Sequence, residues 1–273
     1  MKSVDVGRQR ALITGGSSGI GLAIGKELAR RGYDLLLVSN QEARLAEVKL
    51  QIENEYGVDC STIYIDLVDS LSAEKLFEYC ASNKLKVDIL VNNAGMLIFS
   101  EMISVGSERI NAILGLHIHT PTMLCRLFGD KMKMRRDGHI LNISSISSVM
   151  PYPGISLYGP SKTYMRYFSR AFRGEMKLYD VKVTCLLPGA TETGLYDPRR
   201  VNLKLAKRLG IMQSPEFVAR KAVNALFKNK QECIPGLINK LAVFFLPLIP
   251  SGIIYWIHRN TDLVKKGNEA LEG

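Results

Sequence analysis

The sequence is poor in the features that mark several special classes of protein. Its 273 residues include only five cysteines, and these form no close pair. An odd number of isolated thiols argues against a disulfide framework or a zinc site and indicates reduced, mostly buried cysteines in a cytosolic setting. Residues 1–16 lack the apolar core of a signal peptide, so we expect no secretory leader. No motif typical of nucleic-acid binding occurs, and neither a metal nor a nucleic acid is expected as a partner.

The chain also lacks internal repeats and low-complexity linkers, which favours a single domain. A hydrophobic content of 47% with 23% charged residues is ordinary for a globular protein with a large core. A chain of this length fits one large α/β domain. We expect that domain to span residues 8–235, and residues 236–273 to form an apolar C-terminal extension.

The formal net charge is +10, and basic residues gather at positions 131–136 and 199–208. These clusters have two interpretations. Either they are the solvated face of a helix or loop, or they attract an anionic membrane surface or an anionic cofactor.

Apolar runs rich in leucine and β-branched residues alternate with segments of helical period. Because the runs are almost continuously hydrophobic, they are typical of parallel strands covered on both faces. Gly32 and Gly57 stand where helix C-caps are expected. The alternation predicts an α/β fold with a doubly wound parallel sheet, the Rossmann fold. We expect strands at 10–14, 34–39, 62–65, 89–92, 139–143 and 182–187, and helices at 20–31, 42–56, 72–83 and 158–178.

Residues 241–257 are apolar over a length close to that of a membrane span. Pro247, Pro250 and Gly252 interrupt this stretch, and a proline inside a helix costs roughly 3 kcal/mol. We therefore expect two short apolar helices. Three roles remain open for them: they cover the substrate site, they pack on another copy of the chain in a homo-oligomer, or residues 241–259 lie at a membrane surface.

A glycine-rich turn, TGGSSGIG at residues 14–21, follows the first expected strand and leads into a helix. Its glycines allow a tight turn in which backbone N–H groups approach a pyrophosphate, and the helix adds its positive N-terminal dipole. The spacing G-x-x-x-G-x-G differs from the better-known G-x-G-x-x-G fingerprint. The turn predicts cofactor binding by Gly15, Ser17, Ser18, Gly19, Ile20 and Gly21.

The end of the second expected strand indicates which nicotinamide cofactor binds. An acidic residue there would accept hydrogen bonds from the adenosine ribose and would repel a 2′-phosphate. The sequence instead has Ser39 and Asn40, with Arg44 one turn into the next helix. These residues favour NADP(H) over NAD(H). The alternative interpretation is that they are ordinary loop residues.

Five motifs occur in the order and at the intervals of one known family. They are the glycine-rich turn, NNAG at 92–95, two serines at 144–145, YGPSK at 158–162 and PG at 188–189. In these motifs residues 8–235 resemble the short-chain dehydrogenase/reductase family. The resemblance implies an enzyme that interconverts ketones and alcohols with a nicotinamide cofactor.

Tyr158 and Lys162 are four residues apart, so they share one face of a helix. A free tyrosine titrates near pH ~10 and is a poor base at neutral pH, but a neighbouring ammonium lowers its pKa. Tyr158 is therefore predicted to be the general acid/base at the substrate oxygen. The resemblance implies that Lys162 also holds the nicotinamide ribose. An accidental surface pair is the alternative interpretation.

Ser145 is expected at the end of a strand, where its hydroxyl can hydrogen-bond the reacting oxygen. Its interval to Tyr158 fits the family better than that of Ser144. Many family members carry an asparagine on the preceding helix, where it supports a water in a proton relay. Counting back from the strand places His117 there, not Asn111. His117 either joins the relay as a pH-sensitive member or packs as an ordinary helix residue.

The resemblance alone implies further site residues. By it, Asp66 holds the adenine ring, Thr193 contacts the nicotinamide amide, and Asn92 stabilises the sheet. Residues 190–212 are expected to form a mobile lid. The remaining predicted cofactor contacts are Leu67, Asn93, Ala94, Gly95, Pro188, Gly189 and Thr191.

The lid and the C-terminal part are rich in Leu, Ile, Phe and Met, which favours a hydrophobic substrate such as a 3-oxo lipid or a steroid-like ketone. We expect an NADP(H)-dependent oxidoreductase, located in the cytoplasm or peripherally at a membrane. Two alternatives remain open. One is a non-catalytic NADP(H)-sensing protein, and the other is a nucleotide-sugar epimerase or dehydratase.

Overall fold

The computed structural model describes residues 8–193 and 212–260. In this part of the chain, parallel strands form one seven-stranded sheet in the order β3-β2-β1-β4-β5-β6-β7. The predicted doubly wound, Rossmann-type sheet is confirmed. Its strands are β1 (Arg10–Thr14), β2 (Asp34–Ser39), β3 (Cys60–Tyr64), β4 (Ile89–Asn92), β5 (Gly138–Ile143), β6 (Val181–Leu186) and β7 (Glu232–Cys233).

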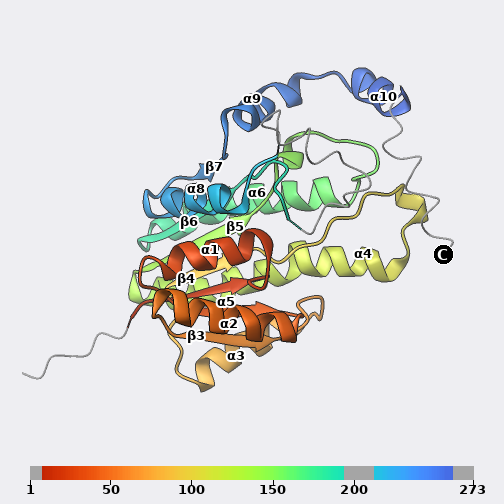
Figure 1. Cartoon of the computed structure of the whole chain (residues 1–273). Coiled ribbons are helices and arrows are strands. Elements are labelled where there is room, and N and C mark those ends of the chain that lie inside the picture. Colours follow the sequence, from red (N-terminus) through yellow and green to blue (C-terminus); the bar gives the residue numbers. More distant parts are fainter. Residues whose placement is uncertain (1–7, 194–211, 261–273) are drawn as a thin grey trace, which may run out of the picture.

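Helices cover both faces of this sheet (Figure 1). On one face lie α1 (Gly19–Ala29), α2 (Glu42–Tyr56) and α8 (Pro215–Phe227), and on the other lie α3 (Ser72–Ser82), α5 (Thr120–Arg135) and α6 (Tyr158–Lys177). Successive side chains of a strand point to opposite faces. Ala11 and Ile13 of β1 thus enter the first core, and Leu12 enters the second. This is why the central strands are hydrophobic at nearly every position.

The strand order reverses between β1 and β4, which are neighbours in the sheet. After β1, the strands β2 and β3 are added on one side of the sheet. After β4, the strands β5, β6 and β7 are added on the opposite side. In a sheet of this kind the crevice outside the carboxyl ends of the strands is the usual ligand site. The loops after β1, β2, β4 and β5 meet there.

The predicted strands and helices match the observed ones to within two residues at each end. Gly57 is a left-handed C-cap with φ 64°, as expected. Several elements were not predicted. They include β7, α8 and the helical run from 107 to 135, which consists of α4 (Ser107–Leu114), a π-helical turn η2 (Gly115–His119) and α5.

The C-terminal arm, residues 237–260, consists of the two short apolar helices that the sequence predicts. They are α9 (Leu237–Phe245) and α10 (Ser251–Asn260), joined by a 3₁₀ turn, η4 (Leu246–Leu248). Among the described residues no helix alone has the length and composition to cross a bilayer. The two segments of the arm are long and apolar enough to cross a bilayer only when taken together, and this pair is bent by 110°. Most of the expected lid (190–212) and all of the basic cluster at 199–208 lie outside the described residues.

Candidate active site

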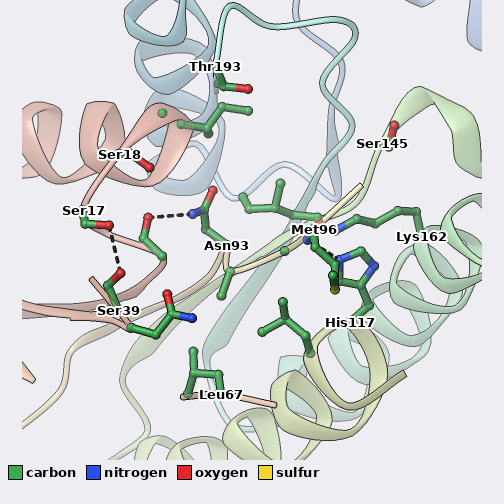
Figure 2. A pocket seen from close by; sticks show the side chains of 18 of the residues that line it. Ser17, Ser18, Ser39, Leu67, Asn93, Met96, His117, Ser145, Lys162 and Thr193 are labelled. Atoms are coloured by element: carbon green, nitrogen blue, oxygen red, sulfur yellow. Dashed lines mark hydrogen bonds between the residues drawn. The ribbon is translucent and has the colours of Figure 1, made fainter. Parts of the chain in front are cut away.

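A cavity of about 500 Å³ opens at the carboxyl ends of the central strands (Figure 2). All the residues predicted to bind cofactor or to take part in catalysis line it, except Gly21 and Arg44. The sequence motifs that lie far apart in the chain therefore converge on one site.

Gly21 and Arg44 lie outside this lining for different reasons. Gly21 belongs to the first turn of α1, and a Cβ there would collide with the carbonyl oxygen of Gly15 and the amide of Asn93. Gly21 therefore permits the close packing of the loop. Arg44 is exposed on α2, and its guanidinium pairs with Glu47 at 2.7 Å. The structure does not bring Arg44 to the cavity.

The glycine-rich loop between β1 and α1 has the backbone that the motif requires. Gly15 and Gly19 have φ 64° and 55°, in the left-handed region where side chains are disfavoured. The Asn93 amide donates to the carbonyl oxygens of Thr14 and Gly15 at 3.0 and 3.2 Å. Asn93 thereby ties the loop after β4 to the glycine loop. Gly19 and Ile20, the first residues of α1, line the cavity, and a helix N-terminus at a cavity binds phosphate in other proteins.

Neutral polar side chains line the cavity at the end of β2. The Ser17 and Ser39 hydroxyls lie 2.9 Å apart, and the Gln41 side chain accepts a hydrogen bond from Ser17 at 3.3 Å. Asn40 also lines this end. Sequence reasoning missed Gln41, although it follows Asn40 directly. No carboxylate stands directly at the end of β2.

Lys162 lines the cavity and is only 6% exposed. Its Nζ donates to the carbonyl oxygen of Ile143 at 3.2 Å and lies 5.8 Å from the centroid of the Tyr158 ring. Burial lowers the pKa of Lys162 to about 8. Lys162 is therefore an interior residue beside a half-buried Tyr158, which argues against an accidental surface pair.

The two serines after β5 have different surroundings. Ser144 is buried, and its hydroxyl donates to the backbone carbonyl of Lys162 at 2.6 Å, so it fixes the backbone of α6. Ser145 caps a 3₁₀ turn, η3 (Ile146–Val149), and its Oγ accepts from the Ser147 N–H at 3.1 Å. The Ser145 proton is left to donate to a ligand in the cavity. This difference supports the choice of Ser145 over Ser144.

His117 is buried in the π-helical turn between α4 and α5, a distortion often found at functional sites. Its Nε2 accepts from the Met96 N–H at 3.0 Å (Figure 2). A neutral ring then carries its proton on Nδ1, which lies 2.9 Å from Ser161 Oγ. Ser161 in turn donates to the carbonyl oxygen of Tyr158 at 2.8 Å.

Burial, and then the nearby positive charge of Lys162, hold the pKa of His117 well below its ordinary value. The ring is therefore neutral at physiological pH, and both of its nitrogens are engaged. It lies edge-on to the Tyr158 ring, with centroids 5.7 Å apart. This geometry favours the interpretation of His117 as a packed, orienting residue over that of a proton relay.

Asn92 forms part of the sheet's interior, as expected. Its amide donates to the side-chain oxygen of Asn142 at 2.8 Å. Sequence reasoning also missed Met96, which lines the cavity and whose backbone holds His117. Only a loop conformation places Met96 there, and no sequence signal indicates it.

Comparisons with known proteins agree with this site. A family model described as short chain dehydrogenase matches residues 9–203. The 17-beta-hydroxysteroid dehydrogenase type 3 of Homo sapiens is 30% identical over 250 residues, which cover 90% of this chain and 77% of the relative. The very-long-chain 3-oxoacyl-CoA reductase-A of Danio rerio is 31% identical over 197 residues, which cover 71% of this chain and 61% of the relative.

Solved structures share the fold. A short-chain dehydrogenase from Sphingobium yanoikuyae in complex with NADPH superposes with a TM-score of 0.76 at 24% identity, over 93% of this chain and 96% of the other. An alcohol dehydrogenase from the archaeon Thermococcus sibiricus, complexed with 5-hydroxy-NADP, gives a TM-score of 0.71 at 26% identity, over 84% and 96%.

Proposed function

The chain belongs to the short-chain dehydrogenase/reductase family, and from that premise we propose that it interconverts a ketone and a secondary alcohol on an apolar substrate, with NADP(H) as cofactor. One observation carries the proposal. The buried Lys162 ammonium lies beside the Tyr158 ring in the same cavity as the glycine-rich loop.

The cavity fits a nicotinamide dinucleotide. The backbone of Gly15 and Gly19 leaves space that a Cβ would fill, since it would meet Asn93 or Thr193. When bound, the cofactor supplies or accepts the hydride. The choice of NADP(H) rests on the neutral side chains of Ser39 and Asn40 at the end of β2, where an acidic residue would repel a 2′-phosphate. Ser17 of the glycine-rich loop lies beside them. Arg44 adds no support, because it pairs with Glu47.

Side chains of this protein would transfer the proton to or from the substrate oxygen. In reduction, Tyr158 donates its phenolic proton to the carbonyl oxygen of the substrate, and in oxidation it accepts the proton of the alcohol. The Lys162 ammonium, 5.8 Å from the centroid of the Tyr158 ring, electrostatically favours the phenolate that remains when the proton has left. Ser145 donates a hydrogen bond to the same substrate oxygen and stabilises the charge that develops there. Reduction is the expected direction with NADPH.

The proposed substrate is a lipid-like 3-oxo compound or a steroid-like ketone. The names of two relatives point to these classes. Apolar side chains of Met96, Leu116 and Ile143 line the cavity near the catalytic groups. They suit an apolar substrate better than a sugar.

The five cysteines are free and buried, and burial raises the pKa of their thiols, for example to about 12 for Cys125. Free thiols of low reactivity support our proposal that the protein is located in the cytoplasm, either free or peripherally at a membrane.

The test is a turnover assay that follows NADPH oxidation with a panel of steroid ketones, 3-oxoacyl thioesters and nucleotide sugars. Tyr158→Phe is the matched control, because it keeps the aromatic ring and removes only the hydroxyl that carries the proton. We expect this variant to lose roughly 10²-fold or more in kcat and to bind NADPH almost as tightly as the wild type.

Two results would replace the proposal. Tight NADPH binding without turnover of any ketone would favour the cofactor-sensing alternative. Turnover of nucleotide sugars alone would favour the epimerase or dehydratase. Activity of Tyr158→Phe within a few-fold of the wild type would remove Tyr158 from its assigned role.

A further inference from the structure

The C-terminal arm carries large apolar side chains that face solvent. Exposed patches of this kind on a soluble protein usually mark an interaction surface. Six of these side chains are 54–72% exposed: Leu237, Phe244, Phe245, Leu248, Tyr255 and Trp256.

The inner side of the arm is anchored to the body of the protein. Asn239 is buried against Gly189, and its amide donates to the Pro235 carbonyl oxygen at 2.8 Å. On α10, Ile254 is buried, and the His258 ring contacts the Tyr152 ring with centroids 5.9 Å apart. The arm therefore already packs on the body of the protein through its inner side, and the exposed side chains lie on its outer side. Figure 1 shows the arm running along one edge of the molecule, away from α2 and α3.

A basic groove of about 650 Å³ lies beside the start of the arm, between α8 and α9. Its carboxylate, Glu232, pairs with Arg166 at 2.8 Å. From Cys233 to Thr261 the sequence contains no Asp or Glu. This edge therefore combines a cluster of positive charge with exposed apolar groups. The lysines that line the groove, all exposed, are Lys221, Lys228, Lys230 and Lys240.

We propose that the arm and this lysine groove form a docking surface for an anionic lipid bilayer. Apolar side chains of a helix that lies in the interface enter the boundary between headgroups and acyl chains. Tyr255 and Trp256 suit that boundary, because each has an apolar ring and a polar tip. The lysines attract the anionic headgroups. The 110° bend keeps the helix pair from forming one straight span.

A second copy of the chain fits this surface less well. A two-fold contact brings the same patch of both copies together. The lysines of one copy would then face those of the other, and the arm offers no carboxylate to either set. Lysine is also depleted in protein–protein interfaces.

The chain has a built-in probe for this proposal, because Trp256 is its only tryptophan. Full-length protein is mixed with vesicles of phosphatidylcholine alone and of phosphatidylcholine with phosphatidylserine. With the anionic vesicles we expect co-sedimentation, a blue shift of Trp256 emission and quenching by brominated acyl chains. Added salt weakens the binding, since it screens the lysines. None of these readouts depends on enzymatic activity, so they stand or fall separately from the proposed reaction.

Two sets of variants, each with its own control, separate the apolar contribution from the electrostatic one. Phe244→Ser with Phe245→Ser should abolish the blue shift, whereas Leu50→Ser with Leu178→Ser, which removes equally exposed leucines elsewhere, should not. Each groove lysine changed to Gln should lower the partition coefficient roughly fivefold on anionic vesicles. The control changes Lys84, Lys131, Lys133 and Lys177 to Gln and removes the same charge from other surfaces.

Three outcomes overturn the proposal. In the first, Trp256 emission stays that of an exposed indole with anionic vesicles. In the second, light scattering detects a dimer whose formation shifts Trp256 emission without lipid, which assigns the arm to a second copy. In the third, both lysine sets weaken binding equally, which reduces the effect to net charge.

Discussion

The Ser17 hydroxyl lies 2.9 Å from the Ser39 hydroxyl and so links the glycine-rich loop to the end of β2. Both residues line the cavity where the adenosine part of a dinucleotide is proposed to bind. A charge placed at this contact would therefore act directly on the choice of cofactor.

Ser39→Asp should reverse or strongly weaken a preference for NADP(H). Two unit charges ~4 Å apart repel by about 4 kcal/mol at an effective dielectric constant near 20, so even a largely screened repulsion costs tenfold or more in kcat/KM with NADPH. The measurement compares kcat/KM for NADPH and NADH. Ser39→Ala is the control, because it removes the hydroxyl contact without adding charge. A wild-type preference for NADH would refute the assignment.

Loss of the Lys162 proton should make kcat/KM for alcohol oxidation fall as the pH rises through about 8. The pKa of Lys162 is lowered to about 8 by burial, so the ammonium is present below that pH and is lost above it. Without the ammonium the phenolate of Tyr158 is less favoured, and kcat/KM for alcohol oxidation should fall. Lys162→Arg, whose guanidinium does not titrate in this range, should be slower but without that fall. A fall that persists in the variant would belong to another group.

His117→Phe should destabilise the fold by up to about 1 kcal/mol, because the partly buried N–H group that it leaves unpaired can still reach water in the cavity. This N–H group belongs to Met96 and donates a hydrogen bond to His117 Nε2. Urea denaturation measures the change. His119→Phe is the matched control, since His119 is exposed in the same π-helical turn.

The pH–rate profile tests the same residue in a second way. Because His117 is neutral at physiological pH, its replacement should remove no limb between pH 6 and 7. A limb that disappears with His117 would favour the relay interpretation instead.

Gly21→Ala should greatly weaken cofactor binding, because its Cβ would collide with the Gly15 carbonyl oxygen and displace the loop. Gly25→Ala on the same helix is the control. Its Cβ would lie at ordinary contact distance, 3.4–3.6 Å, from Ile13, Leu35 and Leu37. A helix gains up to about 1 kcal/mol from such a change. NADPH titration and thermal unfolding of both variants distinguish the two outcomes. Equal effects of the two variants would argue against a special role of Gly21.

The sheet was predictable because its strands are buried on both faces and therefore almost continuously apolar, as in β2. The helical run from 107 to 135 was not, since the π-helical turn at Gly115–His119 shifts the helical period that a sequence pattern relies on. β7 has only two residues, Glu232 and Cys233, which is too short for any periodic signal.

The candidate site shows the same division. Its motif residues converge as expected, because parallel strands all end at one edge of the sheet. The direction of a single side chain did not follow from the sequence. Arg44 has the right position in the chain, but its guanidinium pairs with Glu47 on the exposed side of α2.

Asn239 of the arm packs against Gly189, and Gly189 lines the cavity. If the arm lies on a bilayer, the mouth of the cavity lies beside lipid. An apolar ketone then reaches the cavity by diffusion within the membrane plane and not through bulk water. Turnover would then follow the mole fraction of substrate in the membrane and not its bulk concentration. Adding inert lipid at constant substrate would slow the reaction by surface dilution.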